Sequence, residues 1–117
     1  NVNLFHGRIE SGKAVFGSLV VDPPHGVPAG AQAAQLFVRP YDLEIHTRAN
    51  GQPALRARIT RIQSAGPVVK IELAGDSDQA MQVEMSHERF RHKRHTVGEE
   101  VFVTPRDSKV FVADYCI

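Results

Sequence analysis

The side chains of this chain that could do chemistry are its histidines, its basic residues and one cysteine. His92 and His95 stand three residues apart, a spacing that brings two imidazoles to one side of a helix. No third ligand follows at a suitable spacing, and the cations Arg91, Lys93 and Arg94 lie among them. A solvated basic face is therefore favoured over a metal site, and no metal is expected.

Sequence patterns of common enzymes are missing. The chain has neither a G-x-x-x-x-G-K-[ST] nor a G-x-G-x-x-G phosphate loop, and it has no G-x-S-x-G nucleophile elbow. Cys116 lies beside the C-terminus, where a catalytic nucleophile is disfavoured. The sequence predicts no catalytic and no cofactor-binding residue in this chain.

Residues 36–45 are expected to form a strand, a sharp turn at Pro40 that ends it, and a second extended segment. Pro40 fixes its own φ and pushes Arg39 toward extended geometry, and Asp42 can tie the turn by bonding backbone N–H groups. Arg39 and Asp42 are close enough in sequence to pair across it. We interpret Arg39, Pro40 and Asp42 as a structural corner; the alternative is an anion or partner site that uses Arg39.

Bulk charge and composition restrict the class of partner. The formal net charge is +1 and aromatic residues make up 7% of the chain. Arg56, Arg58 and Arg61 form a basic stripe that could follow a phosphate backbone, but acidic residues are expected beside it. Nucleic-acid binding is therefore disfavoured. No apolar run approaches the roughly 18 residues that span a bilayer.

Apolar and polar residues alternate along most of the chain, as in half-buried strands. The segments that we expect to be strands are 2–9, 14–21, 36–38 with the extended run to 45, 55–59, 68–73, 81–85, 101–104 and 110–112. Asn50-Gly51 indicates a hairpin between its flanking runs, residues 63–67 connect another, and residues 22–30 form a loop. Ser86 is expected to cap one short helix, and 113–117 to be a loose tail.

About eight short strands and one helix suit an all-β fold. Our first choice is an OB-fold-like small barrel of five strands, extended by an N-terminal hairpin, and a β-sandwich is the second. The 117 residues suit a single domain, 1–117. The chain begins at Asn1 without an initiator methionine, so it is expected to be a piece of a longer protein or a mature product.

Four blocks carry a resemblance to a known family. They are Asn1–Arg8 (NVNLFHGR), Phe37–Ile45 (FVRPYDLEI), Arg61–Val69 (RIQSAGPVV) and Val97–Arg106 (VGEEVFVTPR). Together they resemble a TOBE-type domain, and more narrowly the C-terminal regulatory domain of the ATP-binding subunit of sulfate/thiosulfate ABC importers. The Arg-Pro-x-Asp corner is shared by importers of unlike cargoes, so the resemblance implies that the corner is architectural.

The resemblance also implies a setting for the chain. A preceding ATPase domain would carry the phosphate loop and would bind ATP and Mg²⁺, so that this chain alone would hydrolyse nothing. The domain would pair with a second copy of itself as a homodimer and would work beneath membrane permease subunits. Its location would be cytoplasmic, peripheral on the inner face of the bacterial inner membrane.

Two main functions follow. The first is a dimerisation and regulatory module that couples ATP hydrolysis to anion import. The second is a sensor of a small oxyanion such as sulfate or molybdate, bound by Arg39, by Arg61 or by the backbone N–H groups of the Ser64-Ala65-Gly66 turn. A loop simply fitted to the barrel is the favoured interpretation of residues 64–67. A single-stranded nucleic-acid module of the OB type is the remote alternative.

Overall fold

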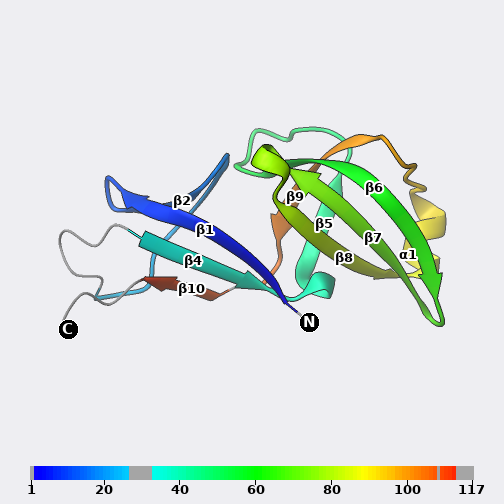
Figure 1. Cartoon of the computed structure of the whole chain (residues 1–117), viewed down its shortest axis with the longest axis horizontal. Coiled ribbons are helices and arrows are strands. Elements are labelled where there is room, and N and C mark those ends of the chain that lie inside the picture. The colour runs from blue at the N-terminus through cyan, green and yellow to red at the C-terminus, as the bar shows by residue number, and fades with distance from the viewer. Residues whose placement is uncertain (1, 27–32, 108, 113–117) are drawn as a thin grey trace.

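Two five-stranded antiparallel sheets lie side by side along the long axis of the molecule (Figure 1). The computed structural model describes residues 2–26, 33–107 and 109–112. Sheet A has the strand order β10-β4-β1-β2-β3. Its strands are β1 (Asn3–Glu10), β2 (Lys13–Phe16), β3 (Leu19–Val21), β4 (Ala33–Val38) and β10 (Lys109–Val112).

Sheet B has the order β5-β9-β6-β7-β8 and curves toward a barrel (Figure 1). Its strands are β5 (Leu43–His46), β6 (Leu55–Ala65), β7 (Val68–Gly75), β8 (Ala80–Ser86) and β9 (Glu100–Pro105). Two 3-10 turns, η1 (Pro40–Asp42) and η2 (Asp76–Asp78), and one helix, α1 (His87–His92), complete the described elements.

The predicted all-β class with one short helix is confirmed. Ser86 caps α1 as expected, because its hydroxyl accepts a hydrogen bond from the Arg89 backbone N–H at 3.1 Å. The extra N-terminal hairpin is larger than predicted, since β1 and β2 belong to a complete second sheet. Part of the predicted loop 22–30 and the predicted tail 113–117, with Cys116, lie outside the described residues.

Local turn signals predicted some hairpins and missed others. The β1–β2 and β6–β7 hairpins form as expected, but the connection predicted at 63–67 is shorter, because β6 continues to Ala65. The run 14–21 is not one strand, because Gly17 takes φ 62° and turns β2 back onto β3. The Asn50-Gly51 hairpin is wrong: β9 lies between β5 and β6 and pairs with both. Asn50 instead closes a local turn by accepting a hydrogen bond from the Gln52 N–H.

A single apolar core runs through both sheets. Strand alternation sends one face of each strand inward, and residues such as Leu36, Ile71 and Val103 are completely buried. The largest share comes from sheet B, where β6, β7 and β9 contribute alternate residues along their length. The core therefore fixes which faces of the edge strands β5 and β8 point inward.

Asn3 joins the two sheets. Its Nδ2 donates to the carbonyl oxygens of Val38 at 3.2 Å and Gln82 at 2.9 Å, while its Oδ1 accepts from the Gln82 N–H at 2.8 Å. Gln79 adds a second link through a hydrogen bond from its Nε2 to the Leu4 carbonyl. Asn3 is 6% exposed, so these bonds satisfy buried polar groups where β1 crosses the edge strand β8.

Candidate functional site

A pocket of about 350 Å³ lies in sheet B between its two edge strands, which we call the seam pocket. Strands β5 and β8 each have a ladder partner on one side, at β9 and β7 respectively. The remaining lining comes from η1, from the segment that includes α1, and from the turn after β9. The lining residues are Tyr41, Leu43, Glu44, Ile45, Val68, Glu84, Met85, Ser86, Arg89, Lys93, His95 and Arg106.

The floor of the seam pocket is apolar. Leu43 and Ile45 alternate inward along β5, and Met85 does the same near the end of β8. Leu43 belongs to the buried core, whereas Ile45 and Met85 are half-buried and pack against it. Val68 adds a half-buried side chain from the start of β7. The floor is thus an opening onto the core of sheet B.

Two cations stand at the rim. Arg89 on α1 and Lys93 at its C-terminal end are exposed and line the pocket. Their side chains make no ion pair or hydrogen bond with any residue in the described part of the chain. Both charges are therefore available to a ligand.

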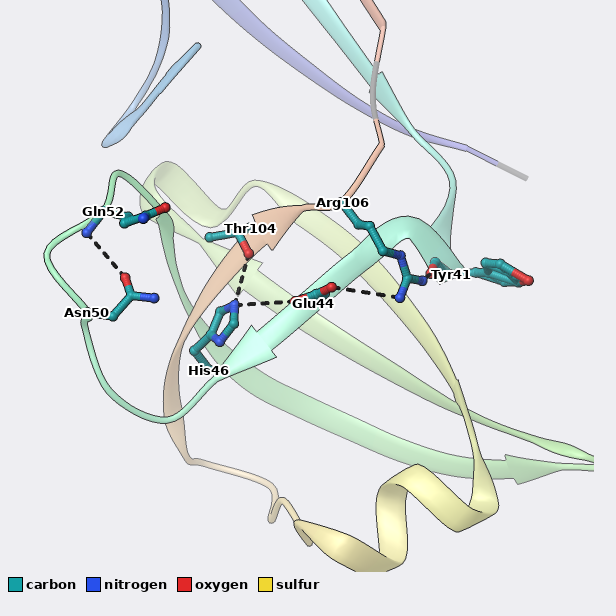
Figure 2. Close-up of polar contacts among 7 residues, drawn as sticks. All are labelled: Tyr41, Glu44, His46, Asn50, Gln52, Thr104 and Arg106. Carbon is teal, nitrogen blue, oxygen red and sulfur yellow. Dashed lines mark hydrogen bonds and ion pairs between the residues drawn. The ribbon is translucent and has the colours of Figure 1, made fainter.

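A third cation, Arg106, is held in place (Figure 2). Its guanidinium donates a hydrogen bond to the Tyr41 carbonyl and lies 3.7 Å from Glu44 Oε2. The other oxygen of Glu44 lies 3.8 Å from His46 Nε2, and this nitrogen is 2.9 Å from the Thr104 hydroxyl. Glu44 therefore already offsets the charge of Arg106.

His95 is a buried polar residue in the wall of the pocket. Its side chain is 3% exposed, and its Nδ1 lies 3.5 Å from Glu99 Oε1. That contact lacks hydrogen-bond geometry, so Nδ1 has no hydrogen-bond partner among the described residues. The Glu99 oxygen instead accepts a hydrogen bond from the Thr96 N–H at 3.0 Å. A buried imidazole with an unsatisfied nitrogen is unusual in a purely structural wall.

The corner at Arg39, Pro40 and Asp42 forms η1, which packs against β8 beside the pocket. Pro40 is buried, and the Asp42 N–H donates to the Arg39 carbonyl at 2.9 Å. The predicted ion pair between Arg39 and Asp42 is absent from the described residues. The turn is fastened through its backbone instead, because the Arg106 N–H donates to the Asp42 carbonyl at 2.6 Å.

The predicted anion residues lie at the far end of the β6–β7 hairpin. Ser64 and Ala65 belong to the β6–β7 ladder, and Gly66, with φ 62°, forms the turn together with Pro67. The Arg61 guanidinium lies 3.7 Å from Glu72 Oε2, and the Gly66 carbonyl oxygen is hydrogen-bonded to His87 Nε2 at 2.9 Å. None of the four lines the seam pocket. Anion binding at these residues stays a prediction.

The sequence did not predict the pocket, although Lys93 and His95, which line it, were considered as parts of a basic face. Lys93 was interpreted only as a member of a basic face, and Arg89 was not singled out as a binding residue. Nothing in the spacing of Ile45 and Met85 shows that they line one pocket. The arginine stripe is largely neutralised, since Arg56 and Arg58 each approach Glu100. In the described part of the chain, no group of three His, Cys, Asp or Glu residues is placed to hold a metal ion. No helix among the described residues is long and apolar enough to cross a membrane.

Comparisons with known proteins divide the chain between β5 and β6. Residues 3–45 match the model of the CysA C-terminal regulatory domain, and residues 49–106 match that of the TOBE-like domain. The first match covers β1–β5 and the second covers β6–β9. The edge strand β5, which lines one side of the seam pocket, therefore lies in the region of the first match although it belongs to sheet B.

The relatives are longer proteins of one kind, ATP-binding subunits of sulfate/thiosulfate importers. A sulfate/thiosulfate import ATP-binding protein CysA from Nitrosomonas europaea is 44% identical, over 95% of this chain and 32% of that protein. One from Bacillus cereus is 35% identical, over 97% of the chain and 32% of the relative. The chain therefore spans about a third of the length of the relatives that it matches.

A solved structure shares the fold. The cytoplasmic molybdate-binding protein ModG, with molybdate bound, superposes with a TM-score of 0.69 over 94% of both chains, at 15% sequence identity. This likeness confirms the OB-like class predicted for the chain, and at this identity it shows the fold alone.

Proposed function

We propose a regulatory role in anion import for this chain, which belongs to the TOBE-type C-terminal regulatory domains of CysA-type ATP-binding subunits. The observation that carries the proposal is the order and extent of the matches. The two family models follow one another along residues 3–106, and the relatives align over nearly the whole chain.

In this role the chain performs no chemistry of its own. A separate nucleotide-binding part of the subunit would hydrolyse ATP with Mg²⁺, and this domain would couple that hydrolysis to the import of sulfate or thiosulfate through membrane permease subunits. The subunit would be cytoplasmic and peripheral to the inner membrane. The domain would also hold two subunits together as a homodimer; sedimentation equilibrium of the isolated chain tests this part, and a strict monomer at high concentration contradicts it.

A chimera tests the cargo. This chain replaces the C-terminal third of the Nitrosomonas europaea relative, in cells that lack their own sulfate importer subunit. We expect uptake of radiolabelled sulfate that approaches the level given by the intact relative. The relative truncated before the domain is the control. A chimera that accumulates to normal levels but imports no sulfate contradicts the proposal.

A second candidate is a sensor of a bare oxyanion, supported by the shared fold of the molybdate-binding protein. The residues for it are Arg61, Ser64, Ala65 and Gly66. The Arg61 guanidinium also lies 3.7 Å from Glu72, and the Gly66 carbonyl is hydrogen-bonded to His87. Calorimetric titration of the chain with sulfate and with molybdate tests it. Heat that disappears in Arg61→Gln supports the site, and the absence of heat with either anion contradicts it.

A further inference from the structure

We propose that the seam pocket binds a small organic anion with an apolar body, rather than a bare inorganic oxyanion. The inference names the kind of ligand that the regulatory domain would sense, so its biological meaning rests on the proposed function. Binding itself is a property of the chain alone and can be measured without the importer.

The floor of the pocket argues for an apolar ligand body. Ile45 and Met85 are half-buried around the buried Leu43, so a ligand that covers them removes apolar surface from water. A tetrahedral inorganic ion offers no apolar surface. It would lose its own hydration against this floor without a compensating hydrogen bond there. The volume of about 350 Å³ also suits an organic molecule, because ligand pockets begin at roughly 300 Å³.

The rim argues for a negative group on that ligand. Arg89 and Lys93 carry charges that no described residue offsets, and both line the same opening. Together they can give charge-assisted hydrogen bonds to one carboxylate, sulfonate or phosphate group. Arg106 is less available, because Glu44 and the Tyr41 carbonyl already hold its guanidinium.

The remaining charged and polar groups limit how much negative charge the ligand carries. Glu84 also lines the pocket, and its register partner on β7 is Lys70. The presence of Glu84 disfavours a highly charged anion. His95 contributes a buried imidazole to the wall, but its Nδ1 lies toward Glu99, which does not line the pocket. A ligand with one anionic group at the rim and an apolar body on the floor fits all these groups.

Three probes separate the two parts of the proposal. Hexane-1-sulfonate has both the anionic group and the apolar body, sodium sulfate has only the charge, and 1-hexanol has only the body. Each is titrated into the isolated chain by calorimetry, at ionic strength held constant with sodium chloride because screening changes with salt. We expect hexane-1-sulfonate to bind with a Kd below about 1 mM and the other two at least about ten-fold more weakly.

Two double variants locate the binding. Arg89→Gln with Lys93→Gln removes the rim cations and is expected to weaken hexane-1-sulfonate about ten-fold or more. Arg91→Gln with Arg94→Gln is the matched control, since these two residues are also exposed on the same segment but do not line the pocket. It is expected to change the Kd less than about two-fold.

The contrary outcomes are distinct. If sulfate binds as tightly as hexane-1-sulfonate, the pocket is a site for a bare oxyanion and the proposal is overturned. If 1-hexanol binds as tightly, the pocket is a purely apolar site and the proposal is overturned. If both double variants weaken the binding of hexane-1-sulfonate equally, the attraction comes from the overall positive charge of the segment, and the proposal is overturned. It is also overturned if hexane-1-sulfonate does not bind to a chain that circular dichroism shows to be folded. Sulfate uptake by the chimera tests the proposed function separately, so failure of one leaves the other standing.

Discussion

Replacing Asn3 with alanine should loosen the joint between the two sheets. The substitution removes three hydrogen bonds and leaves the Val38 carbonyl and both backbone groups of Gln82 without this partner. A buried group that loses its partner costs about 1–3 kcal/mol, and part of this site is open to water. We therefore expect the free energy of unfolding to fall by about 2–4 kcal/mol, a large share of the stability of a domain of this size.

Equilibrium unfolding in urea measures the effect. The midpoint should fall in Asn3→Ala while the slope of free energy against urea stays near that of the unmodified chain. Asn50→Ala is the matched control, because Asn50 is exposed and makes only a local bond to the Gln52 N–H. Its effect should stay within about 0.5 kcal/mol. If the two variants lose equal stability, the role assigned to Asn3 is wrong.

A third variant separates the donor from the acceptor. Asn3→Asp keeps the oxygen that accepts from the Gln82 N–H but places a carboxylate beside the two carbonyl oxygens. Burial among acceptors raises the pKa of the new carboxyl in the folded state. Folding then favours the protonated form of this carboxyl, so the variant should recover stability relative to the unmodified chain as the pH falls below the folded pKa. A loss of stability that is independent of pH would contradict this reasoning.

Three further predictions concern local structure. Gly7→Ala should lower the free energy of unfolding in urea by about 3 kcal/mol, because its Cβ would lie 2.1 Å from the Val15 carbonyl oxygen of β2. Gly75→Ala should lower it by less than about 1 kcal/mol, because its Cβ would lie 3.0 Å from the flexible Met81 methyl. Equal losses in the two variants would refute this. Ser86→Ala should cost about 1 kcal/mol through loss of the helix cap, and an unchanged midpoint would refute the cap. The hydrogen bond from Lys13 holds the pKa of Asp22 below its usual value, so the pair adds stability that is lost as the pH falls through the folded pKa. Lys13→Gln should raise the pKa of Asp22, measured by a carbon-13 titration of its carboxyl group. An unchanged pKa would refute the pairing.

The parts of the fold that the sequence predicts are those decided by near neighbours. Gly66 sets the β6–β7 turn, Ser86 caps α1, and alternation marks most strands. The sheet order depends on partners far along the chain, which turn residues do not specify. Asn50-Gly51 is a sound turn signal, yet β9 inserts between the strands on either side because the core of sheet B places it there.

The candidate site depends on the same long-range order. The seam pocket exists because β5 and β8 are at opposite ends of the sheet B strand order and yet contact each other across the curved sheet. Ile45 and Met85 are forty residues apart in sequence, and their meeting cannot be read from spacing or residue type. The cations Arg89 and Lys93, which have no ion-pair partner among the described residues, were visible as charges in the sequence, but their position over an apolar floor was not.

Coupling of hydrolysis to transport is the central claim, and it is tested by the number of ATP molecules hydrolysed for each sulfate moved. The chimera and the truncated relative are reconstituted with the permease subunits in proteoliposomes, and both quantities are measured in the same vesicles. The account predicts that the chimera keeps the ratio of the intact relative, while the truncated subunit hydrolyses more ATP for each sulfate. Equal ratios and rates with and without this domain would contradict it.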